Sequence, residues 1–197
     1  MKTNVTILLL ILMLIPMSTF SAGDHSHKSK YAGEENREIK SLSETDIEEL
    51  KTGKGWGLAK AAELNGVPGP VHLLEMKEEI DLSADQIRAI EDMYKKMKQE
   101  AISLGLELIE LERELNNHFA NRTISDALLR EILQGIAQVY RQLRYVHLSA
   151  HLNTPDILNS EQITLYNKLR GYSSDDPCEN VPKGHDPEMW KKHHNCP

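Results

Sequence analysis

His147 and His151 have the residue type and spacing in this chain that best suit metal chemistry. They stand four positions apart in "HLSAH", which places both on the same face of a helix, one turn apart. Two neutral imidazoles at that spacing can share one Cu, Ni, Co or Zn ion. The zinc-protease motif would need Glu where this chain has Leu148, so we expect no enzymatic activity. A metallohydrolase is the weakest functional alternative. If the pair has no function, we expect two solvated histidines at the edge of a helix seam.

Other side chains could complete a metal site around this histidine pair. His72 and Glu75 are three residues apart in "VHLLEM", on a short helix that we expect near the same end of the fold. Antiparallel folding would place Met97 and Met93 opposite the pair, where a thioether suits copper or nickel. Met97 also lies on an apolar stripe, so core packing is its default role. The predicted metal site consists of His72, Glu75, His147 and His151, with Met93 and Met97 as further candidates.

Both ends of the chain carry additional histidines. If the chain is cleaved after Ala22, it begins Gly23–Asp24–His25, whose amine, amides and imidazole favour square-planar Cu(II) or Ni(II). Cleavage after Ser21 would abolish that site. The C-terminal tail holds His185, His193 and His194. Cys178 and Cys196 flank these histidines, and in an exported protein the two cysteines predict a disulfide. In a reducing compartment the same residues would suggest a metal knuckle.

The sequence divides into four parts. Residues 1–22 contain Lys2, an apolar run and a zone of small residues, which predict a secretory signal peptide and a periplasmic location. Residues 23–55 are polar, and we expect them to be largely disordered. Residues 56–172 form a helical domain, and residues 173–197 form a tail containing cysteine and histidine. The net charge of −7 argues against nucleic acid as a partner.

Hydrophobic periodicity predicts an all-α protein. A heptad-type stripe predicts a helix from Ala84 to about Ala120, and a second stripe runs from Leu129 to Ala150. The short connection between them requires a long antiparallel helical hairpin. Shorter helices are expected on both sides of it, one of them capped by Ser43 and another running from Val71 to Ile80. Such long helices expose an apolar stripe, so we predict a homodimer.

A repeated motif begins two of these helices. "DLSADQI" supplies Ser83 and Gln86, and "ILNSEQI" supplies Asn159 and Gln162. In each copy the first residue can cap the helix while the glutamine reaches back, which is a capping box. The sequence assigns these four residues a structural role.

The doubled motif around a helical hairpin resembles the LTxxQ family of periplasmic proteins. That family includes the Spy and CpxP chaperone-like proteins and the CnrX and ZraP types of heavy-metal sensor. The segment "GLAKAAELNGVPGPVHLLEM" is similar to the lead-in of a metal-resistance branch, which also carries HxxxH before its second motif. Ser83 and Asn159 replace Thr and preserve the capping chemistry. The resemblance implies a curved helical dimer in a Gram-negative periplasm that works without ATP.

Two functions follow from these observations as expectations. The first is a periplasmic metal-binding protein in metal sensing, resistance or the envelope stress response, binding Cu, Ni, Co or Zn and signalling to an inner-membrane protein. The alternative is an ATP-independent chaperone that holds unfolded client proteins.

Overall fold

The computed structural model describes residues 27–173, 178, 181, 186–193 and 196. Across these residues every regular element is helical and no strand occurs, so the all-α prediction is confirmed. The chain divides into two compact units, Met1–Gly33 and Glu34–Pro197, and the helices belong to the second unit. The predicted signal peptide lies outside the described residues. The helices are η1 (Glu34–Asn36), α1 (Glu44–Thr52), α2 (Lys60–Glu63), α3 (Pro70–Glu75), α4 (Ala84–Ala120), α5 (Asp126–Asn153), α6 (Ser160–Leu169) and α7 (Pro187–His193).

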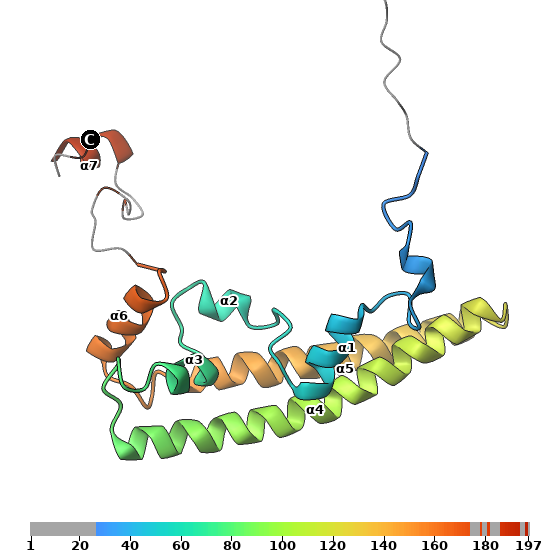
Figure 1. Cartoon of the computed structure of the whole chain (residues 1–197), viewed down its shortest axis with the longest axis horizontal. Coiled ribbons are helices and arrows are strands. Elements are labelled where there is room, and N and C mark those ends of the chain that lie inside the picture. Colours follow the sequence, from blue (N-terminus) through green and yellow to red (C-terminus); the bar gives the residue numbers. More distant parts are fainter. Residues whose placement is uncertain (1–26, 174–177, 179–180, 182–185, 194–195, 197) are drawn as a thin grey trace, which may run out of the picture. The chain divides into compact units, whose positions relative to one another are not determined.

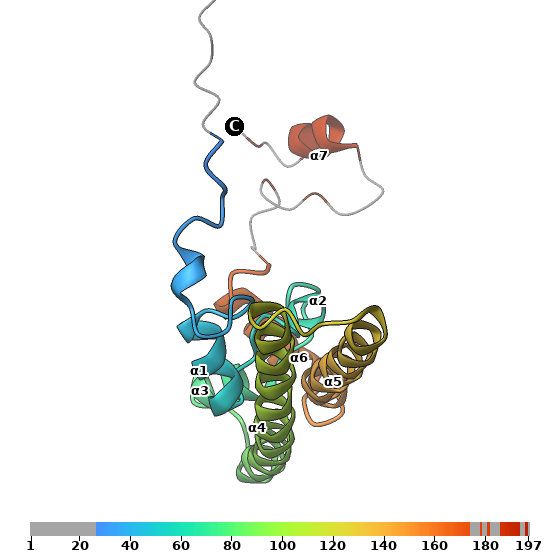
Figure 2. The same cartoon turned by 90° about the vertical axis from the view of Figure 1, so that its right-hand side faces the viewer.

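The long helices α4 and α5 form the main packing unit. They contact each other and lie side by side in both views (Figures 1 and 2). The bounds of α4 agree with those that the stripe predicts. Buried apolar side chains of both helices lie three, four or seven residues apart, which is the spacing of one helix face. They include Met97, Ala101, Leu108, Val139, Leu143 and Val146. In the described part of the chain, no helix combines the length and the apolar composition needed to cross a membrane.

The segment before residue 55 differs from the prediction. We expected it to be largely disordered, but Ile39, Leu42 and Leu50 are buried in the same core cluster as α4 and α5. Ser43 is the N-cap of helix α1, and its side chain accepts from the backbone N–H of Asp46. The segment is polar overall, but these three apolar residues pack against the long helices. Their burial offsets the conformational entropy that the segment loses when it becomes ordered.

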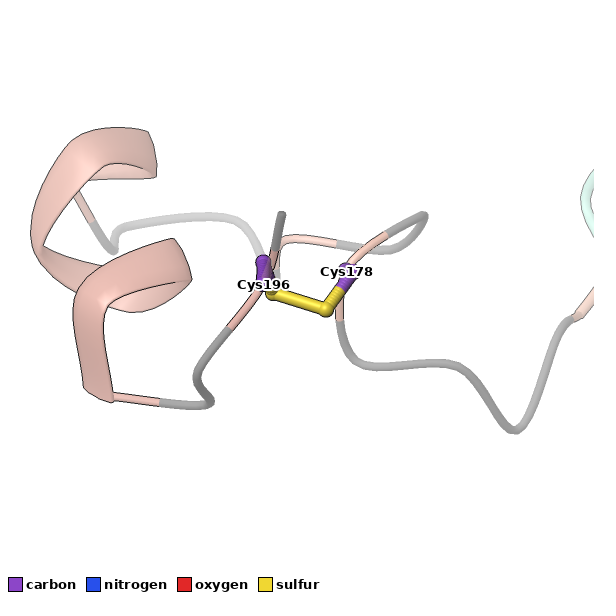
Figure 3. The surroundings of a disulfide bond; sticks show 2 residues. All are labelled: Cys178 and Cys196. Atoms are coloured by element: carbon purple, nitrogen blue, oxygen red, sulfur yellow. A yellow bond between two sulfur atoms is a disulfide. The ribbon is translucent and has the colours of Figure 1, made fainter.

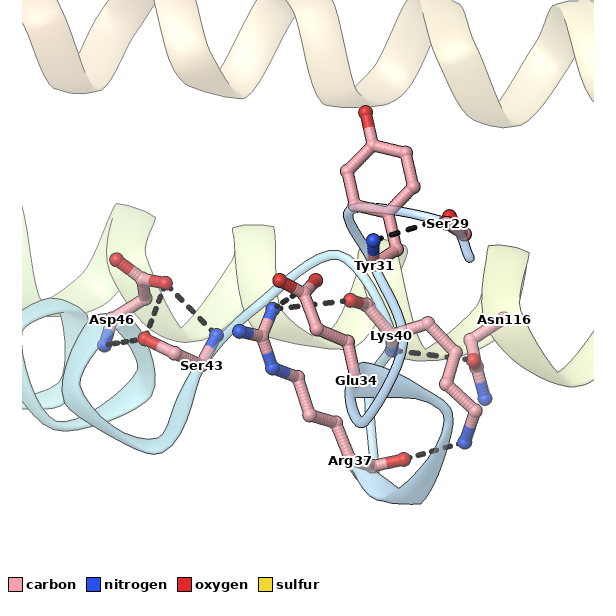
Figure 4. Close-up of polar contacts among 8 residues, drawn as sticks. All are labelled: Ser29, Tyr31, Glu34, Arg37, Lys40, Ser43, Asp46 and Asn116. Atoms are coloured by element: carbon pink, nitrogen blue, oxygen red, sulfur yellow. Dashed lines mark hydrogen bonds and ion pairs between the residues drawn. The ribbon is translucent and has the colours of Figure 1, made fainter. Parts of the chain in front are cut away.

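Two close contacts fix this segment on α4. The backbone of α1 approaches α4 at Gly105, where a Cβ atom would lie 2.5 Å from the carbonyl oxygen of Leu50. Further along, the Lys40 amide donates to the Asn116 side chain (3.4 Å) and the Ser41 hydroxyl donates to Glu112 (2.6 Å). Figure 4 shows the Lys40–Asn116 contact beside the Ser43–Asp46 cap. Only glycine at position 105 allows the two backbones to come this close.

The repeated motif forms the two capping boxes that the sequence predicts. In α4, Ser83 Oγ accepts from the Gln86 amide (3.2 Å) and the Gln86 side chain accepts from the Ser83 amide (2.9 Å). In α6, Asn159 and Gln162 make the same reciprocal bonds at 2.8 and 3.0 Å. Each box satisfies two N–H groups that a helix end leaves without a helical partner.

The two boxes also bind each other, which the sequence did not indicate. Gln86 Nε2 donates to Gln162 Oε1 (2.9 Å), and Gln162 Nε2 donates to Gln86 Oε1 (3.1 Å). The remaining side-chain N–H groups reach backbone carbonyls of the opposite motif, at Ile157 (2.8 Å) and Asp81 (3.3 Å). Each amide therefore closes its own helix start and joins α4 to α6. Beneath this pair lies a second apolar cluster, formed by Leu73, Ile80, Leu82, Ile90, Leu158 and Tyr166.

Candidate functional site

A pocket of about 700 Å³ lies between the segment that contains α2 and α3 and the long helices. Tyr94 and Met97 reach it from α4, and His147 and His151 reach it from α5. Trp56 forms another part of its wall, from the loop between α1 and α2. Its volume lies within the range of about 300–1,000 Å³ that is typical of small-ligand sites.

His147 is a buried imidazole with an unsatisfied nitrogen. Its side chain is 3% exposed, and its Nε2 atom has no hydrogen-bond partner among the described residues. Burial, followed by the charge of nearby His151, lowers the pKa of His147 to about 4. The ring is therefore neutral at pH 7, which is the form that ligates metals.

His151 is oriented by the loop that covers it. Its Nδ1 atom lies 2.9 Å from the Val67 carbonyl. A carbonyl only accepts, so in the neutral ring Nδ1 carries the proton and Nε2 holds the free lone pair. A backbone carbonyl on the opposite nitrogen is the arrangement that fixes a metal-binding histidine. Gly69 makes room for the ring, because a Cβ atom there would lie 2.6 Å from Nε2.

The burial of these two histidines corrects their predicted placement. The sequence placed both at the edge of the helix seam, but they are 3% and 6% exposed. Residues 67–70 cross this face of α5, and Thr154 holds them by donating to the Pro68 carbonyl (2.6 Å). The sequence "VPGP" indicates a turn at this point, but it does not indicate which helix face the turn covers.

His72 belongs to a different group of side chains. Its Nδ1 atom lies 2.7 Å from Glu75, and its Nε2 atom lies 3.6 Å from Glu63. Glu63 in turn accepts from Arg170 and from the Tyr172 hydroxyl (2.8 Å). These hydrogen bonds lower the pKa of Glu63 even though burial, the largest effect on it, opposes them. The sequence did not single out Glu63, because its hydrogen-bond partners Arg170 and Tyr172 lie more than a hundred residues away.

The four-residue metal site is not assembled in the structure. His72, His147 and His151 line the same pocket, but Glu75 is not part of its wall. Within the described part of the chain, no three His, Cys, Asp or Glu side chains are grouped as metal ligands. His147 and His151 therefore share the pocket wall without an assembled set of three such ligands around them.

The sulfur donors lie in the core. Met97 is buried, and Met93 packs against the cluster that also contains Val146 and Ala150. Met97 lines the pocket together with His147 and His151. Met97 is therefore the sulfur donor of the described pocket wall.

The tail contains a disulfide. Cys178 and Cys196 are bonded at an S–S distance of 2.03 Å, as Figure 3 shows. A disulfide sulfur is not a thiolate, so this bond removes the metal-knuckle interpretation. His193 ends α7 and is exposed. His25, His185 and His194 lie outside the described residues, as does the predicted mature N-terminus.

Comparison with known proteins gives no match. No protein-family model, no curated protein and no solved structure matches this chain.

Proposed function

We propose that this is an exported metal-binding protein that acts in metal sensing or resistance. The observation that supports the proposal is the buried pair His147 and His151, both on α5 and both in one pocket wall. A buried polar nitrogen without a partner is unfavourable, and a metal ion would satisfy the free Nε2 of His147. The resemblance of the doubled LTxxQ motif to periplasmic metal sensors supports the same function.

The donor set favours a soft ion. Met97, His147 and His151 offer one thioether and two imidazoles in one pocket wall, and no three His, Cys, Asp or Glu side chains among the described residues are grouped as metal ligands. Cu(I) accepts soft sulfur and low coordination numbers, whereas a six-coordinate ion needs more donors than these three side chains provide. Of the metals that the sequence suggests (Cu, Ni, Co and Zn), copper fits these residues best.

Competition against a chromogenic Cu(I) chelator tests the proposal. We expect the His147→Ala/His151→Ala variant to bind Cu(I) about a hundredfold or more weakly, and His118→Ala to bind as the unchanged protein does. His118 is a matched control because its ring contacts Thr123, outside the pocket. Far-UV circular dichroism must show the same helicity in all variants. Unchanged Cu(I) affinity in the double variant would move binding to the histidine-rich tails and remove this site.

A homodimer and a membrane partner belong to the same proposal. A second copy would cover part of the large side chains that α5 leaves exposed, and an inner-membrane signalling protein would read the metal state. Sedimentation equilibrium at tens of micromolar tests the first point, since a monomeric mass would contradict it.

An ATP-independent chaperone is the second candidate. It is supported by the exposed apolar side chains of α5, of which Tyr145 is 70% and Leu152 is 74% exposed. Exposed apolar surface of this kind can hold unfolded chains. Light scattering of a chemically denatured client should then fall with added protein, and Tyr145→Ser/Leu152→Ser should remove the effect.

A further inference from the structure

We infer that the pocket also binds a small amphipathic anion, a molecule with an apolar body and one carboxylate. This inference goes beyond metal binding, and it depends on walls of the pocket other than the histidine pair. Its evidence is the charge at the pocket, the aromatic lining and a strained loop.

The charge of the pocket is opposite to that of the chain. The whole protein has a net charge of −7, but four cationic side chains line the pocket and only two carboxylates do. The cations are Lys54, Lys60, Lys98 and Arg170. Glu63 is already bonded to Arg170, while the three lysines have no carboxylate partner among the described residues. Unpaired cations around a partly apolar cavity attract an anion and favour its retention.

The rest of the wall suits an apolar body. Trp56, Tyr94, Val71 and Tyr172 contribute rings and aliphatic surface. Lys98 extends over the Tyr94 ring, with its ammonium 5.6 Å from the ring centroid. Aromatic faces beside lysine ammonium groups match a ligand that is apolar along most of its length and charged at one end.

The loop carrying Trp56 is held in an unfavourable conformation. Trp56 has φ 43°, in the left-handed region that bulky residues avoid. Gly53 and Gly57, on either side, also have positive φ. The indole is fixed by donating to Asp46 (2.7 Å) and by an edge contact with Tyr140. A strained backbone conformation persists where the surrounding structure enforces it, and such conformations concentrate at ligand sites. In this loop the strained conformation places the Trp56 ring in the pocket wall.

A buried nitrogen in another part of the wall gives independent support. Nε of Arg170 is buried and has no partner among the described residues. Buried polar groups in folded proteins almost always have partners. A carboxylate can accept from Arg170, which is always protonated.

Tryptophan fluorescence tests the inference on the full chain. In a Trp190→Phe background Trp56 is the remaining tryptophan, and it reports on the pocket directly. Decanoate below its micelle concentration should change the emission saturably. 1-Decanol and decyltrimethylammonium, with the same chain length, should bind at least about tenfold more weakly.

Charge variants give the decisive comparison. Lys54→Gln/Lys98→Gln should weaken decanoate binding about fivefold or more. Lys95→Gln/Lys96→Gln changes the net charge equally but lies outside the pocket wall, so it should bind decanoate as before. Equal loss in both variants, equal binding of decyltrimethylammonium, or no saturable change would overturn the inference. Cu(I) affinity should stay unchanged in Lys54→Gln/Lys98→Gln, so failure here is distinguishable from failure of the metal site.

Discussion

Replacing Gln86 by Glu separates the local role of this residue from its tertiary role. A capping box accepts Glu as readily as Gln, so the sequence motif alone predicts little change. In the structure, however, Gln86 Nε2 donates to Gln162 Oε1 and to the Ile157 carbonyl, at 2.9 and 2.8 Å. A carboxylate cannot donate, and it would face both acceptors with a negative charge.

The magnitude follows from these two bonds. Each contributes about 0.5–1.5 kcal/mol, and Gln162, which is 8% exposed, has little access to water in exchange. We therefore expect Gln86→Glu to lower the free energy of unfolding by about 2–3 kcal/mol at pH 7. For a domain of this size that corresponds to a fall in Tm of about 5–10 °C.

Urea denaturation followed by far-UV circular dichroism measures this loss. Gln99→Glu is the matched control, because Gln99 is exposed on the same helix and makes the same charge change. The difference between the two variants should shrink near pH 4, where protonation returns a donor to the introduced carboxyl. Equal midpoints for the two variants at pH 7 would refute the reasoning and leave Gln86 with its capping role alone.

Two further predictions concern the core. Gly105→Ala should lower the free energy of unfolding by about 1–3 kcal/mol, because the new Cβ would lie 2.5 Å from the Leu50 carbonyl oxygen. Gly135→Ala is the control and should be neutral or stabilising, because its Cβ would meet Leu111 methyl groups at 3.4 and 3.5 Å. Equal urea midpoints for the two variants would contradict the close approach of α1 to Gly105. In metal-free protein, burial of His147 lowers its pKa from 6.5 to about 4, so the unfolded chain takes up the proton first. The free energy of unfolding should therefore fall by up to about 3 kcal/mol as the pH drops through this interval. His147→Leu should remove most of that pH dependence, and an unchanged slope would show that other groups cause it.

Local chemistry explains what the sequence could predict. The two long helices, and the starts of α1, α4 and α6, depend on residues three or four positions apart, such as Ser83 with Gln86 and Asn159 with Gln162. Hydrogen bonds and periodicity at that range form within one helix, whatever the rest of the chain does. The all-α class follows from the same local rules.

The composition of the site depends on contacts between distant segments. His147 and His151 were identified as a pair from their spacing, but their burial comes from residues 67–70 crossing α5, and the Trp56 wall comes from a loop still earlier in the chain. A polar composition likewise concealed the packing of Ile39 and Leu50 against α4.

The sequence by itself determined the two long helices, the capping boxes of α4 and α6 and the histidine pair, because each of these depends on neighbours within one or two helical turns. Only the tertiary structure decided that Gln86 and Gln162 bind each other, that Glu75 lies outside the pocket wall, and that the imidazoles are buried. Burial and pairing across more than seventy residues depend on how segments cross in space, and no local pattern in the chain encodes that crossing.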